Sequence, residues 1–487
     1  MIPRKILPAA VGFISLICLL LLPVNWISKG FALAAVANWV FFTYYFENSY
    51  NPASIFMSLF LFMIGCSQAH LTVIEQDNFA PETWITLAVT IGIFYAVSFG
   101  FMRRFGRIQL NPLMKKSYKI SAPTIFWSNI ICVLSELFIY TYAINKIGSI
   151  PLFDDYVRAN IMPVVINNYL MTLMILPTFF IIFNTIYITQ YKKYGYLFFS
   201  AIYLFLLMLL GGRINIFIPV ITSLFYNLTQ FYLTKEHKAS IMMITTITLA
   251  MVISLMVAMP LVRTHVYVSN QSHANHVSAN TGAKYYDLIY NTPAGSKAQR
   301  LAALEKYQAT VKLKLPSQLL PIWVHLSTEM YAFNKMVTYL EEKHDFRHGR
   351  MLLSGTFRFI TKFFIPEQKL DLVAMGGLSW VNIITFMQKP YMDFGVYGVA
   401  GFMLFFSLTG MVLYQRMQQR KSMTNTIVYS YFCMATLYMV FDNHFYSSAL
   451  IVNISLLLLF KEFLGIDWLA KLRVFKANSS IKTLAYD

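Results

Sequence analysis

Residues 83–104 read TWITLAVTIGIFYAVSFGFMRR, an apolar run that two arginines close. As a helix, this run is long enough to cross a hydrocarbon layer about 30 Å thick. About twelve runs of this kind are long enough, or nearly so, to cross such a layer. They begin near Ile6, Phe31, Ser54, Thr83, Pro123, Val165, Tyr196, Ile214, Ile241, Met392, Thr426 and Ser447. The sequence therefore predicts an all-α polytopic membrane protein with about twelve transmembrane helices.

The composition supports this fold class independently. Of the 487 residues, 57% are hydrophobic and only 12% are charged, which leaves too little polar surface for a soluble domain. The first run follows Arg4 and Lys5 and has no small-residue cleavage site before Trp26, so we expect a retained helix rather than a signal peptide. The cysteines all lie inside predicted spans, which indicates apolar packing rather than disulfides: Cys18, Cys66, Cys132 and Cys433.

The basic residues are concentrated on one side of the predicted membrane topology. Lys and Arg near span ends are retained on the cytoplasmic side, so the basic loop 103–119 is expected inside. Counting spans in both directions then places the N- and C-termini in the cytoplasm. Most of the net charge of +18 lies in these short cytoplasmic segments, where topology alone explains it. The charge therefore gives little support to nucleic-acid binding.

Three regions follow from this topology. Residues 1–262 are expected to form a transmembrane bundle of about nine spans, residues 263–390 a large extracytoplasmic loop, and residues 391–487 a second bundle of about three spans with a cytoplasmic tail. Within the loop, apolar residues recur at helical spacing over 319–340 and predict an amphipathic helix that caps the bundle or lies in the interface. A second such helix is predicted within 349–366.

Three arginines at predicted outer span ends are candidates for binding an anion: Arg158, Arg213 and Arg263. Arg213 ends an otherwise uncharged span after two glycines, which permit close approach of a ligand to the backbone. A guanidinium group keeps its charge and can bind phosphate through two hydrogen bonds. The alternatives are a snorkelling side chain at Arg213 and an ion pair of Arg158 with Asp154 or Asp155.

Three histidines are candidates for a general base. His325 lies on the predicted amphipathic helix with Glu329 one turn later, and a histidine oriented by a carboxylate can accept a proton near neutral pH. His444 and His265 compete with it, and a surface histidine without a function is the simpler alternative for His325. No convincing metal site is complete, and neither a metal nor a cofactor is expected. The chain has no P-loop and no Asp-x-Asp pair, which argues against a soluble nucleotide substrate.

A short signature late in the chain points to a family. The sequence reads SWVNIITF from Ser379 and YMDFGVYG from Tyr391. It resembles the Asn-x-x-Thr and Asp-Phe-Gly-x-x-Gly signature of bacterial oligosaccharide repeat-unit polymerases, the O-antigen and capsule polymerases called Wzy. The Gly-Gly-Arg turn at 211–213 and the long outer loop are similar to that family too. Ile214 follows Arg213 where a second arginine would be common, which puts a paired-arginine clamp in doubt.

The resemblance implies a GT-C-like glycosyltransferase of the bacterial cytoplasmic (inner) membrane. Its substrates would be undecaprenyl pyrophosphate-linked glycans, with membrane lipid and a possible chain-length regulator as partners and no nucleic acid. One lipid-linked chain would pass its glycan to a hydroxyl of another lipid-linked repeat unit, and pyrophosphate would be the leaving group. The residues expected to bind substrate are Arg158, Arg213, Arg263, Asn382 and Tyr391. The residues expected to act as the base or to orient the acceptor are His325, His444 and Asp393.

Other interpretations of the same residues stay open. Gly395 and Gly398 fit close helix packing, and Asp393 fits a cap of the span that begins there. A ligase that moves a finished glycan onto lipid A core would share the fold and the arginines. A polyprenyl-glycan flippase or another transporter would also have about twelve spans, although transporters place charge near the membrane midplane.

Overall fold

The computed structural model describes residues 24–70, 78–105, 120–147, 176–209, 213–233, 246, 320–352, 385–419, 422–439 and 448–465. Within these ranges the chain is helical and contains no strand, which confirms the predicted all-α class. The helices are α2 (Trp26–Phe46), the π-helix η1 (Ala53–Met57), α3 (Ser58–Ser67), α4 (Pro81–Phe105), α5 (Ala122–Ile147), α8 (Leu176–Tyr191), α9 (Tyr196–Leu209), α10 (Arg213–Leu233), α14 (Leu320–Lys343), α17 (Gln388–Gln419), α18 (Met423–Tyr438) and α19 (Ser448–Gly465).

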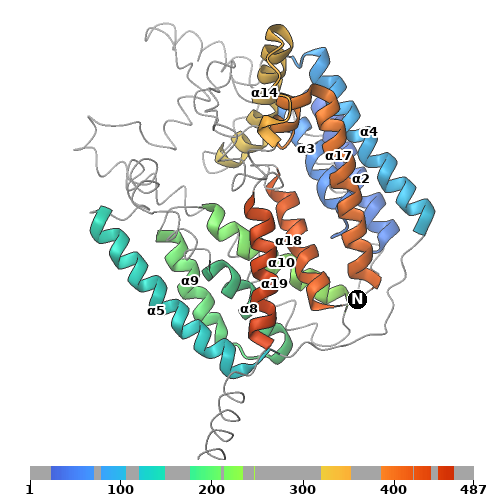
Figure 1. Ribbon diagram of the computed structural model, residues 1–487. Coiled ribbons are helices and arrows are strands. Elements are labelled where there is room, and N and C mark those ends of the chain that lie inside the picture. The colour runs from blue at the N-terminus through green and yellow to red at the C-terminus, as the bar shows by residue number, and fades with distance from the viewer. Residues whose placement is uncertain are drawn as a thin grey trace, which may run out of the picture. The chain divides into compact units, whose positions relative to one another are not determined.

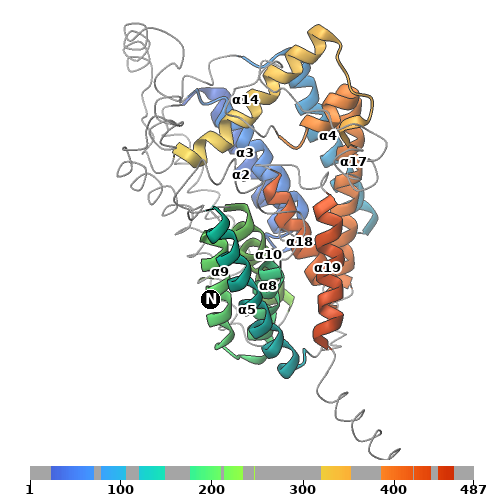
Figure 2. The ribbon, with the colours of Figure 1, turned by 60° about the vertical axis from the view of Figure 1, so that its left-hand side comes forward.

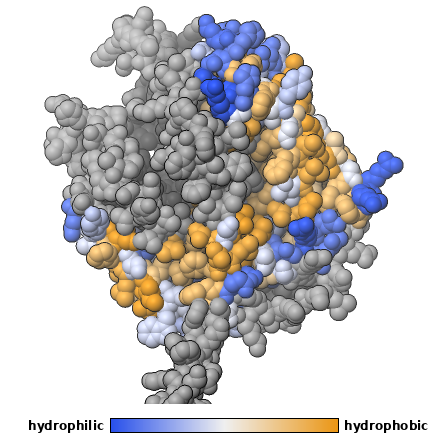
Figure 3. Space-filling model, viewed as in Figure 1, coloured by the Kyte–Doolittle hydropathy of each residue, from blue (hydrophilic) through white to orange (hydrophobic). Residues whose placement is uncertain are grey.

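Three of the described helices are long and apolar enough to cross a membrane: Pro81–Phe105, Ala122–Tyr142 and Gln388–Gln419. Large hydrophobic side chains face outward on them, and Phe405 of α17 is 68% exposed. Figure 3 shows hydrophobic side chains over the flank of α4 and α17 and hydrophilic ones at the end where α14 lies. These features support membrane association, whereas the expected twelve spans and GT-C-like arrangement stay predictions. The spans expected from Ile6, Val165 and Ile241 begin outside the described ranges.

Contacts between residues divide the chain into two units. Unit 1 comprises Met1–Pro112, Ser254–Arg420 and Tyr431–Ile451. Unit 2 comprises Leu113–Ile253, Lys421–Ser430 and Val452–Asp487. The expected regions 1–262, 263–390 and 391–487 were defined by membrane topology rather than by contacts, so they stay a prediction.

In unit 1, α2 and α3 form a close pair joined through η1. The Ser28 hydroxyl donates to the carbonyl oxygen of Gly65 at 2.7 Å, and a Cβ added to Gly65 would lie 3.1 Å from the Ser28 carbonyl oxygen. α4 packs along α17, and α14 packs against α3 and α4 (Figures 1 and 2). Aromatic rings fill the space between these elements, among them Phe56, Phe60, Phe94, Phe386 and Phe406.

In unit 2, α8 is the central helix, with every side chain from Pro177 to Thr189 buried. It packs against α9 and α10, while α5 packs along α9 (Figure 1). Asn129 of α5 and Asn184 of α8 exchange two amide hydrogen bonds of 2.9 Å. The Tyr203 hydroxyl of α9 donates to the carbonyl oxygen of Asn129 at 3.0 Å. Polar side chains that are buried in apolar surroundings thus satisfy one another across three helices.

The first turns of α17 contain a break in the helix. Phe394 (φ −143°, ψ 19°) and Gly395 (φ 58°, ψ −143°) leave helical geometry, and the positive φ of Gly395 favours glycine. A Cβ added to Gly398 would lie 2.1 Å from the carbonyl oxygen of Pro390, which is nearer than any side chain can approach. The two glycines of the Asp-Phe-Gly-x-x-Gly signature therefore allow this break, rather than the packing of one helix on another.

We expect Gly398→Ala to destabilise the protein by about 1–3 kcal/mol, because the new methyl group must displace backbone rather than a flexible side chain. Gly401→Ala is the matched control on the same helix, since a Cβ at Gly401 meets nothing within 4 Å. Alanine should stabilise that position by up to about 1 kcal/mol through helix propensity. Thermal unfolding of the purified protein in detergent, followed by helical circular dichroism, distinguishes the two. Equal thermal unfolding midpoints for the two variants would show that Gly398 is not needed for the break in α17.

Candidate functional site

Two of the sequence-predicted site residues, Tyr391 and Asp393, have described side chains, and both lie on α17. The backbone of Arg213 opens α10 and that of His325 lies in α14, but the positions of their side chains are not described. Four further candidates lie outside the described residues: Arg158, Arg263, Asn382 and His444. The pyrophosphate-binding roles of the arginines and the pairing of His325 with Glu329 therefore stay predictions.

Asp393 is fully buried, and backbone groups occupy both of its carboxylate oxygens. The backbone N–H of Met351 donates to Oδ1 at 3.0 Å and that of Leu352 donates to Oδ2 at 2.8 Å. The first N–H groups of a helix have no partner within it, so this carboxylate caps the helical turn that starts at Arg350. The sequence offered Asp393 as a cap for its own span; the structure shows that it caps a segment about forty residues earlier in the chain.

The backbone reinforces the same attachment. The N–H of Arg347 donates to the carbonyl oxygen of Met392 at 2.8 Å, and that of His348 donates to the carbonyl oxygen of Asp393 at 3.1 Å. The break in α17 removes the regular helical donors for the carbonyl oxygens of Met392 and Asp393. Backbone N–H groups of the 347–352 segment take their place. The signature residues at the start of α17 thus hold this segment through four hydrogen bonds.

Two glycine–phenylalanine contacts secure the same junction. Gly349 has φ +90°, and a Cβ there would lie 3.3 Å from the ring of Phe394. A Cβ added to Gly395 would lie 3.5 Å from the ring of Phe346. Each segment therefore presents a glycine to a phenylalanine of the other, which lets the backbones approach closely.

Tyr391 connects α17 to the last turn of α14. Its hydroxyl donates to Oε1 of Glu341 at 2.6 Å, and its buried ring contacts the rings of Phe333 and Phe346. Glu341 is half-buried, so the tyrosine fixes one carboxylate oxygen while the side chain keeps access to its surroundings. A carboxylate held in this way can accept a proton from a hydroxyl group. Sequence analysis missed Glu341, because the pair Glu341–Glu342 looks like the solvated end of a helix.

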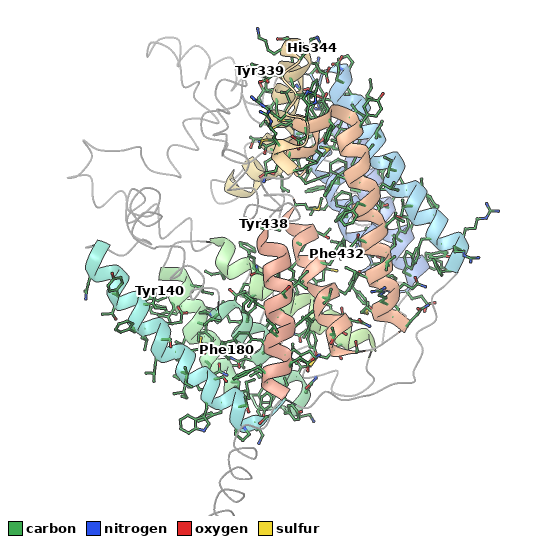
Figure 4. The ribbon with its side chains drawn as sticks, in the orientation of Figure 1. Tyr140, Phe180, Tyr339, His344, Phe432 and Tyr438 are labelled. Carbon is green, nitrogen blue, oxygen red and sulfur yellow. The ribbon has the colours of Figure 1, made fainter. Side chains whose placement is uncertain are left out.

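Basic side chains accompany Glu341 at this end of unit 1: Lys343, His344, Arg347, His348 and Arg350. His344 directly follows the last residue of α14, beyond Tyr339 (Figure 4). Arg347 pairs with Asp345 at 2.7 Å, whereas His348 and Arg350 are exposed. The arrangement can attract an anion and can hold a carboxylate next to it. Among the described residues, no group of three or more His, Cys, Asp or Glu side chains could hold a metal ion.

The middle of α14 differs from the expected amphipathic helix, because residues 327–334 are buried on all sides. Its polar side chains contact neighbouring elements instead of water. Oδ1 of Asn334 accepts the backbone N–H of Ala80 and the hydroxyl of Thr83, both at 2.8 Å, and so caps the start of α4. Glu329 is 2% exposed in the same segment. α14 therefore fixes both the start of α4 and the signature end of α17.

Comparison of the chain with protein-family models, with curated proteins and with solved structures found no match in any of the three.

We expect Asp393→Ala to destabilise the 347–352 segment by about 1–3 kcal/mol, because two backbone N–H groups lose their acceptors in a buried place. Trypsin should then cleave after Arg347 and Arg350 faster than in the wild type, since cleavage follows the population of the open segment. Asp345→Ala is the control, because a partly exposed ion pair contributes about 1 kcal/mol. If Asp393→Ala is cut no faster than Asp345→Ala, the carboxylate does not hold this segment.

Proposed function

We propose that this protein is a membrane-embedded glycosyltransferase that polymerises undecaprenyl pyrophosphate-linked oligosaccharide repeat units into surface polysaccharide, an O-antigen or a capsule. The observation that carries the proposal is the role of the signature residues in the fold. Asp393, Gly395 and Gly398 break an apolar helix at its end and attach a cationic segment there. A substrate with a lipid tail and a charged diphosphate needs this combination of an apolar flank and fixed positive charge.

The cations would stabilise the leaving group. The pyrophosphate gains negative charge as its bond to the sugar breaks, and preorganised positive groups stabilise that charge. Arg158, Arg213 and Arg263 are the proposed diphosphate ligands at the outer membrane face. The exposed guanidinium of Arg350 is a separate candidate for binding an anion, because it lies on the segment that the signature holds.

The reaction needs one base and no external energy source. The bond between the anomeric carbon of the donor glycan and its pyrophosphate oxygen breaks, and a bond from that carbon to the acceptor hydroxyl oxygen forms. The hydroxyl proton passes to the base, and undecaprenyl pyrophosphate leaves. Glu341 is the best-supported base among described residues, because it is accessible and the Tyr391 hydroxyl orients it. Asp393 is buried with both oxygens occupied, which favours a positioning role; His325 and His444 stay candidates.

The topology belongs to the same proposal. The protein would be a multi-pass protein of the bacterial inner membrane, GT-C-like, with about twelve spans and both termini in the cytoplasm. The loop 263–390 would then lie outside, where lipid-linked repeat units are presented. Asn382 would contact the acceptor glycan, and a chain-length regulator is the proposed protein partner.

In vitro polymerisation with purified lipid-linked repeat unit tests the function. We expect the wild type to give a ladder of products, and Arg213→Ala and Arg158→Ala to slow elongation by about 10²-fold or more. Wild-type rates in both arginine variants would rule out their diphosphate role. A single addition would identify a ligase, and transfer of lipid-linked sugar across liposomes without elongation would identify a transporter.

The base is tested by a matched pair of neighbours. Glu341→Gln should lower the rate by about 10²–10⁴-fold, because the amide cannot accept the hydroxyl proton. Glu342→Gln changes the same charge at an exposed position and should keep the wild-type rate. Equal rates in the two variants would exclude Glu341 as the base, whatever the outcome for the arginines.

A further inference from the structure

The inner face of α5 in unit 2 carries a carboxyl group. Cys132, Glu136, Ile139 and Tyr140 recur at helical spacing and are all buried, with Glu136 only 1% exposed. The opposite face is apolar and turned outward, where Leu134 and Phe138 are 63% and 74% exposed. α5 is one of the helices able to cross a membrane.

Glu136 lies deep within that helix. At 1.5 Å per residue, it is about 21 Å from Ala122 and about 17 Å from Ile147. α5 and α9 run side by side, with Tyr140 between them (Figures 1 and 4). The carboxyl group therefore lies away from both ends of the helix.

Both oxygens of Glu136 are buried, and neither has a hydrogen-bond partner among the described residues. The nearby hydroxyl groups donate elsewhere: that of Tyr140 to the carbonyl oxygen of Leu206, and that of Tyr203 to the backbone and side-chain oxygens of Asn129. An ionised carboxylate without donors or a counterion is very unfavourable in such surroundings, whereas a protonated one is tolerated.

Among the residues whose side chains are described, the titratable groups that face Glu136 supply no positive charge. They are Cys132 and Tyr140 on α5 itself and Tyr203 on α9. α8, which also packs on α5, contributes the neutral amide of Asn184 near Asn129. Neither α8 nor α9 contains Lys, Arg, His, Asp or Glu. No cation on these helices can therefore neutralise the carboxylate, and a bound proton is the simplest way to do so.

We propose that Glu136 is a proton-binding site inside unit 2, occupied at neutral pH. Its ligand is the proton itself, not a diphosphate, so the inference is independent of the proposed glycosyltransferase activity. Release of the proton would leave an uncompensated negative charge between α5 and α9. The packing of these two helices would therefore depend on occupancy of the site.

Carbodiimide labelling and infrared spectroscopy test the site in the full-length protein in lipid nanodiscs. Dicyclohexylcarbodiimide reacts with protonated carboxyl groups in apolar surroundings, and we expect mass spectrometry to locate the adduct on Glu136 at neutral pH. Glu136→Gln keeps the side chain's shape without a titratable group. It should abolish that adduct and one carbonyl-stretch band of a protonated carboxylic acid.

Glu462→Gln is the matched control, because Glu462 belongs to the same unit and its side chain is 69% exposed. It should leave both signals unchanged. An unlabelled Glu136 in the wild type, or an undiminished band in Glu136→Gln, would overturn the proposal. Loss of labelling on replacing choline by sodium at constant pH and ionic strength would also overturn it, because the site would then hold a metal cation.

Discussion

The structure depends on one constraint: a backbone or side-chain polar group removed from water needs a partner. At the start of α17 the break at Phe394–Gly395 takes carbonyl groups out of the regular helical pattern, and the 347–352 segment supplies donors for them. The Asp393 carboxylate in turn accepts the unpaired N–H groups of that segment. Asn334 accepts a backbone N–H at the start of α4, and the side chains of Asn129 and Asn184 hydrogen-bond each other between α5 and α8. Several buried polar atoms of the described residues depart from this pattern, and Glu136 does so with both of its carboxylate oxygens.

The helices were predictable because their causes are local. The apolar run at 83–104 lies within α4, and the periodicity over 319–340 nearly matches α14, Leu320–Lys343. The burial of α14 on all sides was not predictable, because it depends on which helices lie against it. The second helix expected within 349–366 is described only at its first turn, Arg350–Leu352.

The candidate site was likewise only partly predictable from the sequence. Tyr391 and Asp393 could be selected because the signature is contiguous, but the partners Glu341 and Met351 are about forty to fifty residues away in sequence. No periodicity relates residues so far apart, and Glu341 next to Glu342 has the pattern of an exposed helix end. The sequence could show that these positions are special without showing which contact each one makes. Asp393 illustrates this, since an aspartate before a helix fits a cap, a base or a substrate ligand equally well.

The order in which the chain is made has a consequence for the 347–352 segment. Met351 and Leu352 are synthesised about forty residues before Asp393, so their amide groups precede the acceptors that they need. The first turn of α17 supplies those acceptors only after it has been synthesised. Completion of this part of the fold therefore depends on a later segment of the chain, and a nascent chain halted before α17 would leave these amide groups without their native partners.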